Sequence, residues 1–305
     1  MKVGFIASAN GLGHLRRLIC IALEFKKLSK SCVILLPCQL PTDSVIPKLV
    51  SDFNLDSKII CSNDYMDGPF TKFQRHDRCR SMFTLDRLDY FDILICDTVL
   101  IDTGKSAIKK ILVAQFLWEW NSRTTLLLDS YRKIFGFNYF TQEYILKLSN
   151  FSSVPLLDYW NLSAYSKKSF SHEICIANSG AVNVSNYLPS EILLQHLPII
   201  YGLDNYLKDN NKPLAVICRP GLGAILECLS SGIIPILIES SDPELNNNLK
   251  ICVKNNWGVA LEDFLKVPSI HRIGFLLNFK NARESPIFIQ RDTYVRDYLL
   301  PALDY

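Results

Sequence analysis

The sequence predicts an α/β protein made of two doubly wound, Rossmann-like domains that face a cleft. Short runs rich in Ile, Val and Leu alternate with amphipathic stretches, which is typical of buried parallel strands joined by crossover helices. The 305 residues are enough for two domains of about 150 residues each. A glycine-rich turn follows a strand in each half, and the carboxyl ends of strands are where α/β folds bind ligands.

Composition narrows the class of protein further. Hydrophobic residues make up 49% of the chain and charged residues 21%, which excludes a disordered or fibrous protein. A formal net charge of +3 is low for a domain that binds phosphate backbones, so we expect no nucleic-acid partner. No apolar run is long enough to span a bilayer, and the N-terminus reads as a first strand rather than a signal peptide. The ten cysteines form no CxxC pair and lie mostly in apolar runs, which predicts buried, reduced thiols in a cytoplasmic protein.

The first half predicts a regular strand and helix pattern. A helix is expected over residues 14–29, where apolar side chains recur at helical spacing and basic ones point outward. Strands are predicted, in order, over residues 2–8, 32–37, 57–61, 93–96 and 111–115.

The second half repeats this pattern after a linker. The linker is placed at about residues 158–171, a stretch rich in Ser, Tyr and Asn with weak periodicity. We therefore expect an N-terminal domain over residues 1–160 and a C-terminal domain over 161–305. Predicted strands cover 173–177, 197–201, 215–218 and 233–238, and predicted helices cover 187–195, 222–230, 244–255 and 290–304.

The first glycine turn carries the first chemical signal. Gly11 and Gly13 follow the first strand, and His14 opens the helix behind them. Glycines let a ligand approach the backbone, and the N-terminus of a helix favours an anion. His14 is therefore a candidate base or phosphate ligand, with a capping or packing role as the alternative. Arg16 and Arg17 are adjacent on the helix and cannot both face inward.

This turn does not predict a dinucleotide cofactor. The third glycine of a dinucleotide fingerprint is replaced by Arg16, and the strand over 32–37 ends without the expected acid. The sequence also has no GxxxxGK[ST] loop. We expect no cofactor.

The second glycine turn follows the strand over 215–218. Pro220, Gly221, Leu222 and Gly223 turn the chain into a helix, so backbone N–H groups and a helix dipole again lie at the carboxyl end of a strand. Glu227, one turn into that helix, is either a ligand for ribose hydroxyls or an ordinary exposed helical glutamate.

The second turn resembles the nucleotide-binding signature of MurG-like glycosyltransferases, which are GT-B enzymes of the family 28 type. Cys218-Arg219-Pro220-Gly221, followed by Glu227, is similar to that family's C-R-S-G-x-x-T/A-x-x-x-E segment and has its Arg-to-Glu spacing. Gly11-Leu12-Gly13-His14-Leu15-Arg16 resembles the G-x-G-H-x-x-R motif of the same broad group, and residues 241–248 resemble its E-Q-x-x-N segment. Asp97, at the end of a strand, looks like the acid found there after a late N-domain strand.

The resemblance implies a GT-B fold and a set of donor-binding residues. The backbone N–H groups of Leu222, Gly223 and Ala224 would bind the diphosphate, and Glu227 would hold the ribose. His14 would be the catalytic residue, and Asp97 an acid of the cleft. Carried over to this sequence, the nucleotide-sugar site comprises Gly11, Gly13, Arg219, Gly221, Leu222, Gly223, Ala224, Glu227, Glu244, Asn247 and Asn248.

The chain also departs from the family pattern. Leu245 replaces the glutamine that follows Glu244, which removes an amide that would read the sugar. The stretch from Gly180 to Arg219 is short for the family, so a shortened C-terminal domain is expected. Two alternatives to a transferase stay open. One is a PseG-like nucleotide-sugar hydrolase, a class that shares the G-x-G-H-x-x-R turn. The other is a non-catalytic GT-B relative that binds a ligand or partner, which the short domain and Leu245 motivate.

The charge of a departing diphosphate must be stabilised, and no metal site is predicted for that task. No two aspartates stand two residues apart, and His and Cys form no compact ligand cluster. Helix N-termini, backbone N–H groups and an arginine are the remaining means. Arg219 either neutralises the leaving group or pins the loop, and both roles stay open here.

The sequence thus predicts a metal-independent glycosyltransferase. It would transfer a hexose or N-acetylhexosamine from a nucleotide-diphosphate sugar, with UDP favoured, to a glycan or lipid-linked acceptor. The aromatic segment 116–120, with aromatic residues over 131–140, is an acceptor wall, a membrane-facing patch or ordinary core. Peripheral association with the inner face of the membrane is therefore left open.

Overall fold

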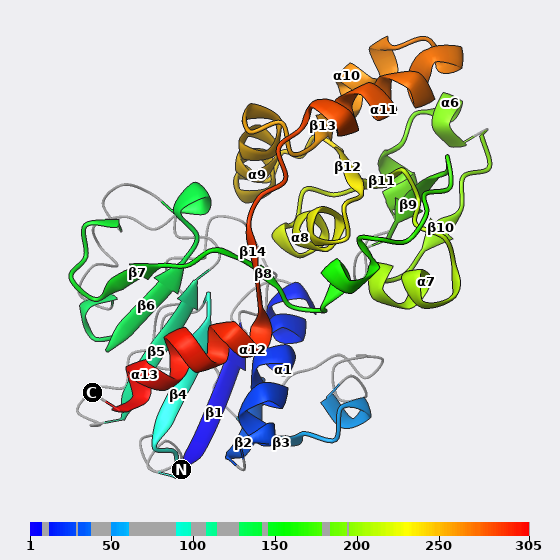
Figure 1. Cartoon of the computed structure of the whole chain (residues 1–305). Coiled ribbons are helices and arrows are strands. Elements are labelled where there is room, and N and C mark those ends of the chain that lie inside the picture. The colour runs from blue at the N-terminus through cyan, green and yellow to red at the C-terminus, as the bar shows by residue number, and fades with distance from the viewer. Residues whose placement is uncertain are drawn as a thin grey trace. The chain divides into compact units, whose positions relative to one another are not determined.

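The computed structural model describes residues 1–7, 12–28, 30–37, 50–60, 90–98, 108–114, 128–141, 146–178, 184–193 and 195–304 (Figure 1). The chain divides into two compact units. Unit 1 comprises Met1–Val154 together with Arg291–Tyr305, and unit 2 comprises Pro155–Gln290.

Unit 1 is built on a seven-stranded parallel sheet in the order β3-β2-β1-β4-β5-β6-β7. The order reverses between β1 and β4, as in doubly wound folds, where this point binds ligands. The elements of unit 1 are β1 (Lys2–Ala7), α1 (Leu12–Lys27), β2 (Ser31–Pro37), β3 (Asp56–Ile60), β4 (Ile93–Asp97), β5 (Lys109–Ala114), β6 (Lys133–Gly136), η4 (Asn138–Phe140), β7 (Phe151–Ser153), α12 (Arg291–Tyr294), η8 (Val295–Leu299) and α13 (Leu300–Asp304).

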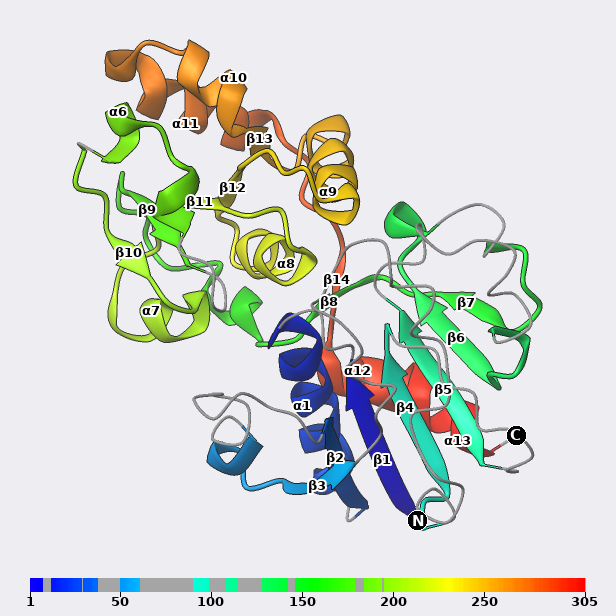
Figure 2. The same ribbon diagram turned by 180° about the vertical axis from the view of Figure 1, so that it is seen from behind.

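The C-terminal helices α12, η8 and α13 cover one face of this sheet. They lie in front of β1, β4 and β5 in Figure 1 and behind them in the opposite view of Figure 2. The Tyr294 and Tyr298 rings meet Phe135 of β6 edge-on at 6.0 and 6.2 Å. The Arg291 Nε donates to Glu24 Oε1 of α1 at 2.6 Å. These contacts explain why residues 291–305 belong to unit 1 and not to the predicted C-terminal domain over 161–305.

Unit 2 is built on a five-stranded parallel sheet in the order β10-β9-β11-β12-β13. Ile174, Ile176, Ala215, Ile217 and Ile236 alternate along three of these strands and pack into one buried cluster, as the period of two requires. The elements of unit 2 are β8 (Leu156–Asp158), η5 (Leu162–Tyr165), β9 (Ile174–Ala177), η6 (Val184–Tyr187), α6 (Ser190–Leu193), β10 (Ile199–Ile200), α7 (Leu203–Asp209), β11 (Ala215–Cys218), α8 (Leu222–Ser230), β12 (Ile234–Leu237), α9 (Pro243–Lys254), β13 (Val259–Ala260), α10 (Leu261–Lys266), η7 (Ser269–His271), α11 (Arg272–Ala282) and β14 (Phe288–Gln290).

The predicted linker is an ordered segment of unit 2. The chain leaves unit 1 after Val154, so the boundary lies before residue 160. Strand β8 pairs in parallel with β14, where the chain returns toward unit 1. The Asp158 carboxylate then accepts the backbone N–H groups of Leu162 and Ser163 at 2.7 and 2.8 Å, which caps η5.

The predicted elements are present, with one helix interrupted. All predicted strands are found within about two residues of their expected ends, which is the usual uncertainty. The helix expected over 187–195 is instead η6 and the short α6, which begins after Pro189. A proline has no backbone N–H to donate and disfavours a helical residue before it, so it interrupts the run.

Two further sequence expectations can be compared with the structure. Every cysteine in the described ranges is free and buried, which confirms the predicted thiols at Cys20, Cys32, Cys96, Cys175, Cys218, Cys228 and Cys252. Among the helices that the structure describes, none is long and apolar enough to cross a bilayer.

We predict that Glu24 holds the C-terminal helices on unit 1. In the Glu24→Gln variant, the backbone amides of residues 291–304 should exchange with solvent about tenfold faster, because a charge-assisted hydrogen bond is weakened. Hydrogen exchange followed by mass spectrometry measures this. Lys27→Ala is the matched control, since Lys27 is 63% exposed and also pairs with Glu24 but leaves the Arg291 bond intact. Equal exchange in both variants would contradict the assignment.

Candidate functional site

A buried polar network lies at the topological switch point of unit 1. Asp97 is the last residue of β4 and lies opposite Ala7, the last residue of β1, in the parallel register. The helix α1, which carries His14 and Arg17, comes after the carboxyl end of β1. The fold therefore brings a strand end and a helix start together at the edge of the sheet that doubly wound folds use for binding.

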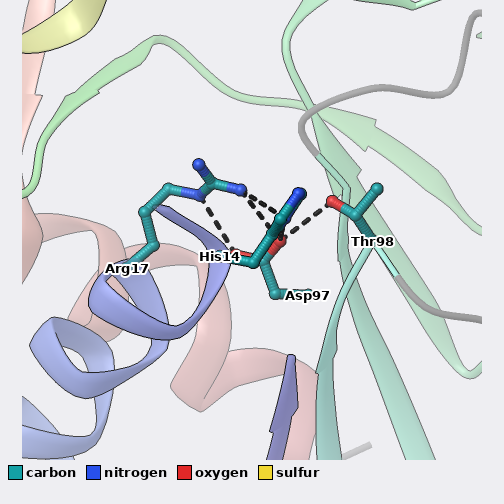
Figure 3. A network of polar contacts seen from close by, with 4 residues as sticks. All are labelled: His14, Arg17, Asp97 and Thr98. Atoms are coloured by element: carbon teal, nitrogen blue, oxygen red, sulfur yellow. Dashed lines mark hydrogen bonds and ion pairs between the residues drawn. The ribbon is translucent and has the colours of Figure 1, made fainter. Parts of the chain in front are cut away.

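The network is held by short hydrogen bonds (Figure 3). The His14 Nδ1 lies 2.8 Å from Asp97 Oδ1. The Arg17 Nε and Nη2 donate to Asp97 Oδ2 and Oδ1 at 3.1 and 3.0 Å, which is a two-pronged pair. The Thr98 Oγ1 donates to Asp97 Oδ1 at 2.9 Å. Three side chains thus converge on one carboxylate.

Because the network is buried, its charges must be neutralised by groups inside the protein. The Asp97 side chain is 0% exposed and that of Arg17 is 4% exposed. Burial alone would raise the pKa of the Asp97 carboxyl, yet the Arg17 guanidinium and the His14 ring hold that pKa below its usual range. Asp97 is therefore a carboxylate that neutralises the Arg17 charge inside the protein.

The geometry also restricts the protonation of His14. Its Nδ1 lies 2.7 Å from Arg17 Nη2 as well as 2.8 Å from Asp97 Oδ1. A guanidinium only donates, so Nδ1 either accepts from Arg17 or carries a proton and donates to Asp97. In the second arrangement the other ring nitrogen, Nε2, is an acceptor only when the ring carries no second proton, and it lies on the side away from the carboxylate (Figure 3). That arrangement is the one a general base requires.

Thr98 adopts an unusual backbone conformation to complete the network. Its φ is 52°, in the left-handed region that a β-branched residue rarely occupies. Its backbone N–H donates to the Val113 carbonyl at 3.1 Å, while its hydroxyl reaches Asp97. Strain of this kind costs about 1–3 kcal/mol and is often found at functional sites.

The structure adds Arg17 and Thr98 to the residues singled out from the sequence. Arg17 lies three residues after His14, and this spacing puts both side chains on one helix face. Counted from Gly11, the G-x-G-H-x-x-R motif also ends on Arg17 and not on Arg16. Gly13 is described and exposed, whereas Gly11 lies outside the described residues. Among Arg16 and Arg17, Arg17 is the one that faces inward.

The second glycine turn forms an open helix N-terminus in unit 2. Gly221 is the N-cap of α8 and makes no side-chain cap hydrogen bond. The first N–H groups of a helix have no partner within the helix, so those of Leu222, Gly223 and Ala224 face the space before α8. Among the residues that the structure describes, no atom lies within 4 Å of the place that a Cβ would take at Gly221 or Gly223, so these residues leave room for a ligand at the turn.

One charged residue precedes this helix start, and another lies within the helix. Arg219 is half-buried between β11 and the turn, and its guanidinium forms no hydrogen bond or ion pair with any residue that the structure describes. Glu227 is half-buried on α8.

The α9 helix, which follows the next strand, has a different N-terminus. The Asp242 side chain caps it by accepting the N–H groups of Glu244 and Leu245. Glu244 is buried and Asn247 half-buried. Asn248 is 0% exposed, and its Nδ2 donates to the Pro220 carbonyl at 2.9 Å. Asn248 therefore braces the turn before α8.

Most of the aromatic residues noted in unit 1 belong to its core. Tyr131, Phe135, Phe137 and Phe140 are buried, whereas Tyr139 is 54% exposed. The segment 116–120 lies outside the described residues. The described ranges contain no group of three His, Cys, Asp or Glu side chains arranged to hold a metal ion.

No protein-family model and no curated protein matches this sequence. Solved structures do match it, with low sequence identity and high coverage. The spinosyn rhamnosyltransferase SpnG in complex with thymidine diphosphate aligns with a TM-score of 0.60 and 11% identity, over 97% of this chain and 99% of that chain. MurG from Acinetobacter baumannii aligns with a TM-score of 0.60 and 11% identity, over 98% and 99%. The glycosyltransferase SsfS6 from Streptomyces sp. SF2575, also with thymidine diphosphate, aligns with a TM-score of 0.58 and 10% identity, over 98% and 99%.

These similarities establish the fold. The chain has the two-sheet α/β architecture of the GT-B glycosyltransferases over nearly its whole length, which confirms the fold predicted from the sequence. At 10–11% identity, they leave function to be argued from the side chains.

We predict that Asp97 is essential for the stability of unit 1. The Asp97→Asn change leaves the buried Arg17 charge uncompensated and should lower the free energy of unfolding by about 3 kcal/mol at pH 7. The deficit should shrink below about pH 4, because a carboxyl whose folded pKa is lowered contributes stability above its unfolded value near 3.9, and this stability is lost as the pH falls. Urea unfolding at pH 7 and pH 3.5 measures both effects.

The matched control for this experiment is Asp92→Asn. Asp92 is 63% exposed and interacts with the N-terminal amine, so the same chemical change should alter stability by less than about 1 kcal/mol. An Asp97→Asn variant as stable as this control would show that the network contributes no stability.

Proposed function

We propose that this protein is a metal-independent glycosyltransferase. It transfers a hexose or N-acetylhexosamine from a nucleotide-diphosphate sugar to a glycan or lipid-linked acceptor. The observation that carries the proposal is the open N-terminus of α8 beside Arg219, on a GT-B fold. Neighbours with this fold bind thymidine diphosphate, which supports a nucleoside diphosphate as the ligand; UDP is the nucleotide that the sequence favours.

The start of α8 suits a diphosphate leaving group. As the glycosidic bond breaks, negative charge develops on the diphosphate oxygens. Backbone N–H groups at Leu222, Gly223 and Ala224 and the positive end of the helix dipole stabilise that charge without reorganising. The Arg219 guanidinium adds a full positive charge. We assign the ribose to Glu227 and the sugar to Glu244 and Asn247, with Asn248 bracing the turn.

The network in unit 1 suits a general base. When its Nδ1–H donates a hydrogen bond to Asp97, His14 can take the proton of an acceptor hydroxyl on Nε2 as that oxygen attacks the sugar. The imidazolium that forms is stabilised by the Asp97 carboxylate. Arg17 supports the step by holding Asp97 ionised and in place.

A water molecule in place of the acceptor would turn the same parts into a nucleotide-sugar hydrolase. The base and the leaving-group site would act identically, because only the attacking oxygen differs. The two reactions are separated by whether nucleotide release requires an acceptor.

We predict that His14→Ala lowers turnover by about 10²- to 10⁴-fold with little change in nucleotide affinity, as expected for loss of a base. Release of UDP or TDP from a panel of nucleotide sugars would be measured with and without glycan and lipid-linked acceptors. Release only with an acceptor supports transfer, and release without one supports hydrolysis. The control is Arg16→Ala, because Arg16 is adjacent to the inward-facing Arg17 but does not itself face inward. Absence of nucleotide release from every donor would contradict the proposal.

We predict that Gly223→Asp separates ligand binding from folding. An aspartate in the first turn of α8 favours the helix dipole and should raise unfolding stability slightly, by about 0.3–1 kcal/mol. The same charge repels a diphosphate, so UDP or TDP should bind at least about tenfold more weakly. Calorimetry and thermal unfolding measure the two effects.

Gly223→Asn is the matched control for this design, because it adds nearly the same side chain without the charge. The open space at Gly223 should accept it with the fold intact. Equal nucleotide affinity in the Asp and Asn variants would show that the diphosphate binds elsewhere.

A further inference from the structure

Three cations gather at the amino edge of the sheet in unit 2. Lys212 precedes β11, and Lys280 and Arg283 lie at the end of α11. Phe170, which precedes β9, forms an isolated bridge with Lys212. Because the strands are parallel, this edge is opposite to the one from which α8 begins.

Two of the cations contact one aromatic ring, and two donate to backbone carbonyl groups. The Nζ atoms of Lys212 and Lys280 lie 3.9 and 2.8 Å from the centroid of the Phe170 ring. The Lys212 Nζ donates to the Ser166 carbonyl at 2.5 Å. The Arg283 Nη1 donates to the Ile233 carbonyl at 3.1 Å. Aromatic faces and carbonyls attract cations but carry no net charge.

No acid balances this cluster. Among the residues that the structure describes, no carboxylate forms an ion pair with Lys212, Lys280 or Arg283, and the Lys280 ammonium donates no hydrogen bond. An ammonium has three N–H donors and a guanidinium has five. Most N–H donors of the cluster therefore have no acceptor among the described residues. The cluster therefore has donors in excess and a net positive charge.

The position of Lys212 makes that charge costly. Lys212 is 1% exposed, whereas Lys280 and Arg283 are half-buried. Burial, together with repulsion from Lys280 and Arg283, lowers the pKa of the Lys212 ammonium to about 8. A buried cation beside two others is stabilised when an anion binds among them.

We propose that Lys212, Lys280 and Arg283 form a second anion site, which takes a phosphate group with close to two negative charges. A tetrahedral phosphate offers acceptors in several directions, and an arginine fork suits it. Lys280 and Arg283 contact the ligand from the half-buried rim, and Lys212 adds its charge from beneath. The site and the α8 turn lie at opposite ends of the strands of this sheet. The proposal does not depend on the proposed transferase activity.

The experiment titrates the full chain with inorganic phosphate and with sulfate, in a Gly223→Asp background that blocks the α8 turn. Saturable binding is expected, and Lys280→Ala or Arg283→Ala should weaken it at least about tenfold, as loss of a charge-assisted hydrogen bond predicts. Lys266→Ala is the control, because Lys266 is 64% exposed and already paired with Glu262 and Asp263. Equal affinity in the Lys280→Ala and Lys266→Ala variants, or no saturable binding, overturns the proposal.

A pH series adds a readout that a purely structural cluster would not show. Sulfate keeps its charge between pH 6 and pH 9. Within the described part of the chain, Lys280 and Arg283 are the charged groups that act on the Lys212 ammonium. Sulfate affinity should fall as the pH rises through about 8, because Lys212 loses its proton there. The Lys212→Met variant should abolish this dependence of sulfate affinity on pH. If that variant does not fold, sulfate affinity is measured in Lys280→Gln, because Lys280 is only half-buried. Affinity that is independent of pH in the parent protein contradicts the role of Lys212.

Discussion

The buried charge of Asp97 is the constraint on which the architecture of unit 1 depends. A carboxylate with no exposed surface must be balanced, and the balancing groups come from α1, on a different part of the chain. The pairing of β4 with β1 sets the position of Asp97, while the start of α1 sets those of His14 and Arg17. Even the strained backbone of Thr98 follows from this charge, since the left-handed turn brings its hydroxyl back to the carboxylate. The result is a histidine ring that is oriented by an ionised aspartate.

Both units pair buried charges internally, as Asp97 with Arg17 and Arg272 with Glu191 show, but unit 2 also carries cations that no described carboxylate pairs with. In unit 1, Glu24 accepts hydrogen bonds from Arg291 and Lys27, and Asp97 accepts from Arg17. These buried carboxylates are therefore neutralised by partners within the same unit. In unit 2, the described residues leave positive charge unbalanced at both edges of the sheet: at the open start of α8 beside Arg219, and at the cluster around Phe170. Positive charge that no acid balances favours the binding of an anion. The electrostatics therefore support the two anion sites proposed for unit 2.

Local sequence patterns predicted many of the strands and helices but missed the helices α7, α10 and α11. Apolar runs predicted the strands, and helical spacing predicted α1, α8 and α9, because each pattern reflects burial of one face. Strands β6 and β7 were not predicted, since three or four residues are too few to show a period. The helix over 290–304 was predicted but assigned to the wrong unit, because its contacts with Glu24 and Phe135 join residues far apart in sequence. Arg17 was within reach of sequence reasoning, because its distance from His14 is a helical period; the strain at Thr98 was not.

The anion site proposed at α8 depends on a difference between two neighbouring helices. Both α8 and α9 begin at the carboxyl ends of adjacent parallel strands, so both N-termini attract anions to the same edge of the sheet. Asp242 satisfies the first N–H groups of α9 and adds a negative charge, which removes α9 as a competitor. Gly221 has no side chain with which to cap α8. Asn248 of α9 then fixes the Pro220 carbonyl, so the capped helix holds the uncapped one in its open form. The site is thus defined as much by the cap on α9 as by the glycines before α8.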